Sequence, residues 1–157
     1  MPAIGQSAPD FKLQDQNETW VTLDDYLKHS PLLIVFYPGD FTPVCTKQLC
    51  AYQDALNEFV KLGLMIVGIS KNSPDEHQEF KKRYGFSFPL LSDPDRTITK
   101  AYGVTSLFLL GGTSRAVFVV GQDKKIKYRY VEPTTLTHRK PGELLQILGN
   151  LRSEQKL

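Results

Sequence analysis

Two runs of apolar residues stand out along the chain and predict the core of a sheet. Residues 32–37 and 64–70 are short and almost unbroken in apolar character, which is typical of strands buried on both faces. A helix signal follows each run. Pro43 opens an amphipathic pattern that we expect to continue as one helix to about residue 61, and Ser73 with Pro74 opens a second helix.

Shorter elements are expected around these two strands. Polar turn residues separate the strands of two expected hairpins, an N-terminal one with strands at 11–13 and 20–22, and a later one with strands at 115–120 and 126–131. The remaining expected elements are a helical turn at 23–28, a strand at 88–91, a short helix at 95–102 and a closing helix at 141–151. This alternation predicts an α/β fold with a central mixed β-sheet flanked by helices, formed by residues 1–157 as one domain.

Charge and composition exclude several classes of partner. Lys and Arg number 19 and Asp and Glu number 17, so the net charge is +2, and the basic residues are scattered. We therefore expect no nucleic-acid groove and no membrane-binding patch, and we interpret residues 81–83 (Lys-Lys-Arg) as a solvated helix face. No apolar run approaches the roughly 20 residues of a membrane span, and the first residues do not resemble a secretory signal, so we expect a cytoplasmic protein.

The metal-binding residue types are few. Three histidines, His29, His77 and His138, are dispersed, and the chain has two cysteines. This set makes no plausible zinc site, so we expect neither a metal nor a cofactor. We expect the histidines to be solvated, and Trp20 with most Tyr and Phe residues to belong to the core.

The placement of Cys45 points to chemistry. The breaker residues 38–40 must end the strand, Thr42 can cap the next helix, and Pro43 suits the first helical position. Cys45 then lies in the first helical turn, where unpaired backbone N–H groups and the helix dipole favour a thiolate. In a reducing compartment, Cys45 and Cys50, five residues apart, are catalytic more often than structural.

These residues carry a family resemblance. The pattern Pro38-x-x-x-Thr42-x-x-Cys45 resembles the active-site motif of the peroxiredoxins, which are thiol peroxidases with a thioredoxin-like fold. Residues 5–13, 88–94 and 101–104 also resemble family segments, so the likeness spans most of the chain. Arg115 matches the family's catalytic arginine, and a second cysteine at Cys50 is similar to the bacterioferritin comigratory protein or peroxiredoxin Q branch.

The resemblance implies a mechanism and its partners. Cys45 attacks a peroxide and becomes a sulfenic acid, Thr42 and Arg115 contact the sulfur and the peroxide oxygens, and Pro38 and Pro43 complete the motif, with Pro43 shielding the sulfur. A thioredoxin-like dithiol is the implied reductant. We expect a monomer or a weak homodimer.

Helix geometry constrains Cys50. Five residues along an α-helix correspond to a rise of about 7.5 Å and a rotation of about 140°, which puts the two Cα atoms roughly 8 to 9 Å apart. A disulfide requires Cα atoms within about 7 Å. If Cys50 resolves the sulfenic acid of Cys45, the helix between them must unwind. The other interpretation is that Cys50 is a small buried hydrophobic residue.

Two positions depart from the pattern of many relatives, and one segment has several interpretations. Gln48 stands where a glutamate is common and Gln53 where an arginine is common, and neutral amides preserve hydrogen bonding but not charge. The apolar residues 107–110 fit a strand, a wall for an organic peroxide, or a subunit contact.

Three other functions are weighed against the two-cysteine peroxidase. A one-cysteine peroxidase would rely on an external thiol. A thiol–disulfide oxidoreductase usually has a Cys-x-x-Cys pair, whereas four residues separate Cys45 from Cys50. A non-enzymatic redox sensor or holdase would not need Thr42 and Arg115, because it has no leaving oxygen to stabilise.

Overall fold

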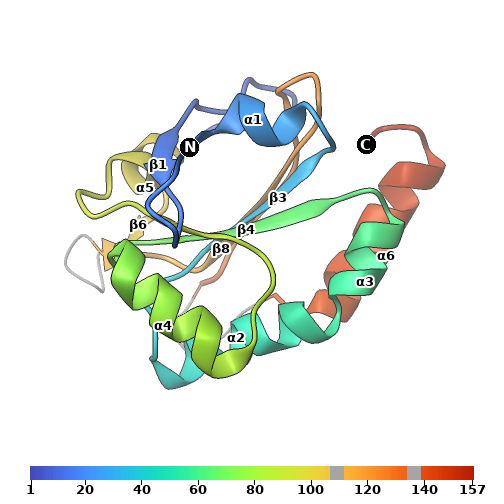
Figure 1. Ribbon diagram of the computed structural model, residues 1–157. Coiled ribbons are helices and arrows are strands. Elements are labelled where there is room, and N and C mark those ends of the chain that lie inside the picture. The colour runs from blue at the N-terminus through green and yellow to red at the C-terminus, as the bar shows by residue number, and fades with distance from the viewer. Residues whose placement is uncertain (107–111, 134–138) are drawn as a thin grey trace.

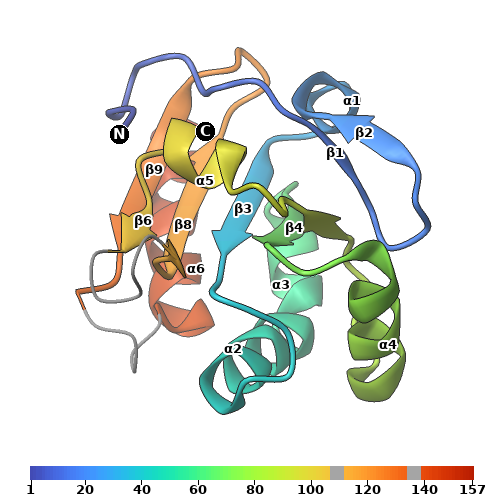
Figure 2. The same cartoon turned by 90° about the vertical axis from the view of Figure 1, so that its left-hand side faces the viewer.

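A mixed seven-stranded sheet forms the centre of the molecule, and helices cover both of its faces (Figures 1 and 2). The computed structural model describes residues 1–106, 112–133 and 139–157. The strands of the sheet are β1 (Lys12–Gln14), β2 (Trp20–Thr22), β3 (Leu32–Phe36), β4 (Met65–Ser70), β5 (Leu90–Ser92), β8 (Ala116–Val120) and β9 (Ile126–Val131). They lie in the order β2-β1-β5-β4-β3-β8-β9. Strands β3, β4 and β5 are parallel and the other pairings are antiparallel.

The helices divide between the two faces of this sheet. They are α1 (Leu23–Leu27), α2 (Pro43–Asp54), α3 (Leu56–Lys61), α4 (Pro74–Tyr84), α5 (Thr97–Ala101) and α6 (Pro141–Ser153). Helices α2, α3, α4 and α6 cover one face, and α1 and α5 cover the other (Figures 1 and 2). The predicted mixed sheet with flanking helices and an N-terminal hairpin is therefore confirmed, and each predicted strand begins and ends within two residues of its expected position.

Strand β3 shows why its sequence is apolar without interruption. All five of its side chains are fully buried. Leu32, Ile34 and Phe36 belong to the core on the α1 and α5 face, whereas Leu33 and Val35 belong to the core on the α2, α4 and α6 face. Successive side chains of a strand point to opposite faces, so a strand covered by helices on both sides has no polar position.

The expected single helix over residues 43–61 is wrong, because the helix breaks at Ala55. Its backbone angles there (φ −93°, ψ 4°) leave the helical range and separate α2 from α3. In a straight helix, two residues seven positions apart in the sequence are separated by about 10.5 Å along the helix axis. The bend instead brings the rings of Tyr52 and Phe59, both fully buried, to a stacked contact of 5.8 Å. Packing against the sheet thus overrides a favourable local sequence.

The expectation that Trp20 belongs to the core is also wrong, because Trp20 is 58% exposed to solvent. Trp20 lies on β2, which is an edge strand of the sheet, and the Lys12 ammonium lies 5.9 Å from its ring centroid. Alternation of apolar residues cannot distinguish an edge strand from a central one.

A short antiparallel ladder, β6 (Thr105–Ser106) with β7 (Gly112–Thr113), was likewise not predicted.

The basic run at 81–83 is solvated only in part. Lys82 and Arg83 are exposed on α4, as expected. Lys81 is half-buried, its Nζ donates a hydrogen bond to the Phe88 carbonyl at 2.6 Å, and burial lowers its pKa. Among the helices that the structure describes, none is long and apolar enough to cross a membrane.

Candidate active site

The loop between β3 and α2 carries the proline and threonine of the motif. Pro38 is half-buried in this loop, and Pro43 is exposed at the first position of α2. Thr42 has the extended backbone of an N-cap residue, but its side chain makes no capping bond. Its hydroxyl donates instead to the Gly39 carbonyl, at 3.2 Å. The expected side-chain cap is therefore wrong, and the hydroxyl braces the loop.

Cys45 and Arg115 meet although they lie far apart in the sequence. Cys45 is fully buried in the first turn of α2, and Arg115, immediately before β8, is 4% exposed. The Arg115 Nη1 donates to the Cys45 sulfur at 2.8 Å. A guanidinium remains charged and donates hydrogen bonds from fixed positions, so Arg115 places a positive charge and a hydrogen-bond donor directly beside the Cys45 sulfur.

Gln48, one turn further along α2, orients the arginine. The same Arg115 Nη1 donates to the Gln48 Oε1 at 3.1 Å, and Gln48 is 1% exposed. The amide thus keeps the hydrogen bond without the charge, as expected. Gln53 lies outside this group, because its Nε2 donates to the Ser87 hydroxyl at 3.0 Å and its Oε1 accepts from the Ser87 N–H at 2.8 Å. Gln53 therefore ties α2 to the segment after α4.

Cys50 lies on the same intact helix as Cys45, and both thiols are free. Its side chain is half-buried and packs against the core beneath α2. Burial, with a smaller contribution from the negative charge of Asp54, raises the pKa of the Cys50 thiol. In the intact helix Cys50 is therefore a protonated and weak nucleophile.

A buried polar network lies beneath the loop, and the sequence did not predict it. His77 of α4 is fully buried, which contradicts the expectation that it is solvated. Its Nδ1 lies 2.7 Å from the Asp40 Oδ2 and its Nε2 lies 3.1 Å from the Leu91 carbonyl oxygen. The Tyr37 hydroxyl donates to the Asp40 Oδ1 at 2.6 Å. Burial and the neighbouring Asp40 hold the pKa of Tyr37 well above its ordinary value, so Tyr37 remains a donor.

The other expected residues add little to the site. His29 is exposed, as expected, whereas His138 and residues 107–110 lie outside the described residues. Within the described ranges, no group of three or more His, Cys, Asp or Glu side chains could hold a metal ion.

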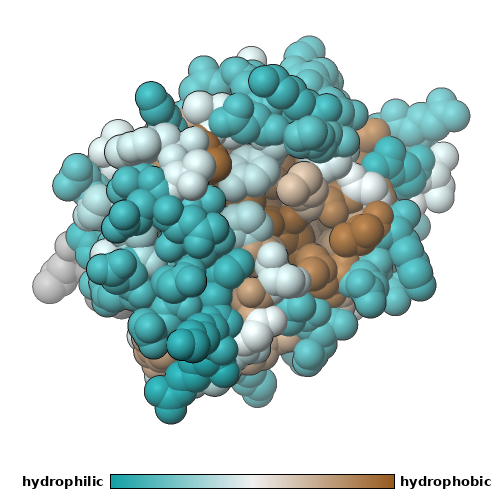
Figure 3. Space-filling model, in the orientation of Figure 1, coloured by the Kyte–Doolittle hydropathy of each residue, from teal (hydrophilic) through white to brown (hydrophobic). Residues whose placement is uncertain are grey.

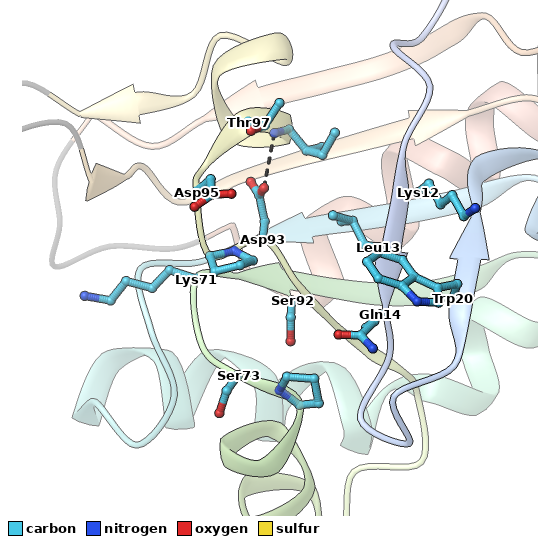
Figure 4. Close-up of a pocket in the computed structure, with 13 residues that line it drawn as sticks. Lys12, Leu13, Gln14, Trp20, Lys71, Ser73, Ser92, Asp93, Asp95 and Thr97 are labelled. Carbon is cyan, nitrogen blue, oxygen red and sulfur yellow. Dashed lines mark hydrogen bonds between the residues drawn. The ribbon is translucent and has the colours of Figure 1, made fainter.

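A pocket of about 430 Å³ lies apart from the cysteines, between β1, β2 and the carboxyl ends of β4 and β5 (Figure 4). The Ser92 hydroxyl points into it between Ser73 and Gln14. Ser92 is 5% exposed, and its Oγ makes no hydrogen bond within the described protein. Asp93, at the rim of the same pocket, accepts a hydrogen bond from the Ile98 N–H at 3.3 Å.

An apolar patch occupies part of the surface near α3. Figure 3 shows a cluster of apolar side chains on this face, surrounded by polar side chains. A shallow pocket of about 160 Å³ lies between α3 and the segment before β5. Its lining includes Leu56 and Val60 of α3 and Phe88 and Pro89 on the other side. Val60 is 58% exposed, so the patch is accessible to solvent.

Known proteins resemble this chain in sequence and in structure. The AhpC/TSA family model matches residues 4–129. A chloroplastic protein of rice (Oryza sativa subsp. indica) called putative peroxiredoxin Q is 37% identical over 147 residues, which are 94% of this chain and 67% of the rice protein. The putative peroxiredoxin bcp of Coxiella burnetii is 44% identical over 101 residues, which are 64% of this chain and 66% of that protein.

Two crystal structures extend the likeness to the fold. Peroxidoxin BcpB of Mycobacterium tuberculosis superposes with a TM-score of 0.84 at 30% identity, covering 98% of both chains. A mutant of PrxQ from Xylella fastidiosa gives a TM-score of 0.83 at 26% identity, covering 99% of this chain and 98% of its own. The predicted thioredoxin-like fold is thus confirmed.

The family model covers most of the chain, so the protein belongs to the AhpC/TSA family, the peroxiredoxins. Within that family its similar proteins place it in the peroxiredoxin Q and bacterioferritin comigratory protein branch, as the sequence predicted.

Proposed function

We propose that the protein is a two-cysteine thiol peroxidase that reduces hydrogen peroxide and organic hydroperoxides through Cys45. The observation that carries this proposal is the contact of 2.8 Å between the Arg115 guanidinium and the buried Cys45 sulfur. The Cys45 thiolate attacks one peroxide oxygen, the O–O bond breaks, and the other oxygen leaves as water or an alcohol after taking a proton. Sulfur loses two electrons and becomes a sulfenic acid, and the peroxide gains them.

Arg115 supports this reaction over simple thiol exchange. Negative charge moves from the sulfur to the leaving oxygen, and a fixed cation beside the sulfur stabilises both the start and the end of this transfer. Thr42 lies three residues before Cys45 and has its hydroxyl in the same loop, within reach of a hydrogen bond to the Gly39 carbonyl. A redox sensor or an oxidoreductase has no departing oxygen to stabilise, so it does not need Thr42 and Arg115 beside the cysteine.

Cys50 is our proposed resolving cysteine. Its thiolate attacks the sulfur of the sulfenic acid, hydroxide leaves and takes a proton to become water, and a Cys45–Cys50 disulfide remains. Both cysteines lie in α2, so its turns between them must unwind first. Unwinding also releases Cys50 from the burial that raises its pKa, so Cys50 becomes a better nucleophile when it is needed. A thioredoxin-like dithiol then reduces the disulfide.

Intact-mass measurement of three proteins tests this sequence. Each reduced protein receives one equivalent of hydrogen peroxide and its free thiols are then trapped. We expect wild type to lose two hydrogens as a disulfide, Cys50→Ser to gain one oxygen as a sulfenic acid, and Cys45→Ser to remain unreacted with its fold intact. Peroxide consumption by Cys45→Ser at the wild-type rate would refute the nucleophile.

The same variants separate the two peroxidase mechanisms. If Cys50→Ser turns over with thioredoxin as fast as wild type, the protein is a one-cysteine peroxidase and Cys50 is structural. We also propose a cytoplasmic location and a monomer or weak homodimer, which fractionation and sedimentation test.

A further inference from the structure

His77 and Asp40 form a buried pair that the peroxidase mechanism does not use. Neither side chain is exposed to solvent. Asp40 belongs to the loop that precedes α2, and His77 belongs to α4, 37 residues later. The pair is therefore a tertiary link between the active-site loop and a helix that takes no part in the chemistry.

The two contacts of His77 fix its protons. The Nε2 lies 3.1 Å from the Leu91 carbonyl oxygen, which only accepts hydrogen bonds, so Nε2 carries a proton. The Nδ1 lies 2.7 Å from the Asp40 Oδ2, so a second proton lies between these two atoms. His77 therefore links Asp40 to the backbone of β5 through two hydrogen bonds at once.

Other contacts hold Asp40 from further directions. Its Oδ1 accepts from the Tyr37 hydroxyl at 2.6 Å, and its N–H donates to the Asn72 Oδ1 at 2.8 Å. The next residue, Phe41, has a positive φ of 64°, which is rare for a bulky side chain. Its ring packs 4.9 Å from that of Phe80 on α4. The loop is thus clamped onto α4 up to the residue before Thr42.

We propose that His77 is a positioning residue that clamps the start of α2 in its peroxide-reactive arrangement. It also sets the N-terminal limit of the unwinding of α2. This inference rests on the proposed function. The intact loop and helix hold Cys45 against Arg115 for the first step, whereas the second step requires α2 to open. A clamp on the loop favours the first state over the second.

The proposal therefore predicts opposite effects on the two steps. A released loop populates the intact site less, so sulfenic-acid formation becomes slower. The same release makes unwinding easier, so disulfide formation becomes faster. A side chain that only stabilised the fold would not shift the two rates in opposite directions.

Rapid-quench mass spectrometry measures both rates in the full-length protein. In His77→Gln and Asp40→Asn we expect sulfenic-acid formation to slow about tenfold and disulfide formation to accelerate by a similar factor, because a buried partner is lost. The matched control is Thr99→Val, which removes an equally buried hydrogen bond of 3.0 Å to Asp93 and should change neither rate. Unchanged rates, or a fall in both, in the two test variants would overturn the clamp.

Two further readouts keep the test decisive. Nitrogen NMR of the reduced wild type should find the His77 Nε2 bonded to hydrogen, and an unprotonated Nε2 would overturn the proposal even if the variants do not fold. If wild type forms no disulfide, the role of Cys50 fails. The clamp is then decided by the sulfenic-acid rate, which must fall in His77→Gln and stay unchanged in the equally buried control Thr99→Val.

Discussion

Arg115 reaches Cys45 from 70 residues further along the chain, and one of its nitrogens serves both the sulfur and Gln48. We expect Arg115→Ala to retain the thiol but to lose about 2 to 4 kcal/mol of transition-state stabilisation, by analogy with removal of an oxyanion donor. The second-order rate constant with hydrogen peroxide, measured by stopped flow, checks this. The control is Arg129→Ala, which removes a guanidinium that donates to the Pro2 carbonyl at 3.1 Å and should leave the rate unchanged. A tenfold or smaller loss in Arg115→Ala would argue against the role.

The residues of the site differ in how far the sequence could predict them. Cys45 was predictable because its surroundings, a strand end followed by a helix start, are local. Arg115 was found only through the family resemblance, since nothing near it in the sequence indicates a partner. His77 was missed because its burial depends on Asp40, which lies 37 residues away, and a histidine has no local pattern that distinguishes core from surface.

Helix α2 contains both cysteines, so the state of this element is expected to report the redox cycle. We predict that backbone amides of residues 45–52 exchange slowly with solvent in the reduced protein and quickly in the Cys45–Cys50 disulfide form, because the helix geometry separates the two sulfurs too far to bond. Hydrogen exchange with mass spectrometry checks this. Amides of α6 serve as an internal control and should not change. Equal protection of 45–52 in both forms would contradict the unwinding.

Elements with strong local signals were predicted well. Pro74 at the first position of α4 and the capping box of Ser73 with Glu76 mark that helix start in sequence and in structure. The break at Ala55 had no such signal, because alanine favours helix and the bend arises from packing of Tyr52 and Phe59. The edge position of β2, which exposes Trp20, depends on strand order and is equally invisible to local pattern.

At the scale of the whole molecule, close packing on the central sheet leaves no room for a side chain at Gly68. A Cβ at Gly68 of β4 would lie 2.8 Å from the Leu90 Cδ2 and 3.1 Å from the Tyr37 Cε1, both on fully buried side chains. We expect Gly68→Ala to lower the free energy of unfolding by about 1 to 3 kcal/mol through overpacking. Denaturant unfolding monitored by circular dichroism measures this.

A second glycine supplies the control with the opposite sign. Gly149 lies within α6, and a Cβ there would have no neighbour within 4 Å. Gly149→Ala should raise the free energy of unfolding by about 0.5 to 1 kcal/mol, because alanine loses less backbone entropy in a helix. Equal shifts in the two variants would show that the space around Gly68 does not limit the packing.

The class of fold followed from the order of elements, whereas the arrangement in space did not. Alternating strands and helices indicate parallel pairing, and the closing hairpin indicates an antiparallel part. The placement of β5 between β1 and β4 comes from contacts between distant segments, and no pattern within β5 encodes it.

The bend at Ala55 affects how much of the protein opens during the proposed catalytic cycle. A protein that opens part of itself at every turnover exposes apolar surface each time, and repeated exposure promotes aggregation. The proposed opening of residues 45–52 ends at Tyr52, whose hydroxyl donates to the Arg139 carbonyl at 3.2 Å and whose ring stacks on Phe59 across the bend. Because α2 already ends at Ala55, we expect α3 and the core beneath it to stay closed when α2 opens, which limits the apolar surface exposed at each turnover.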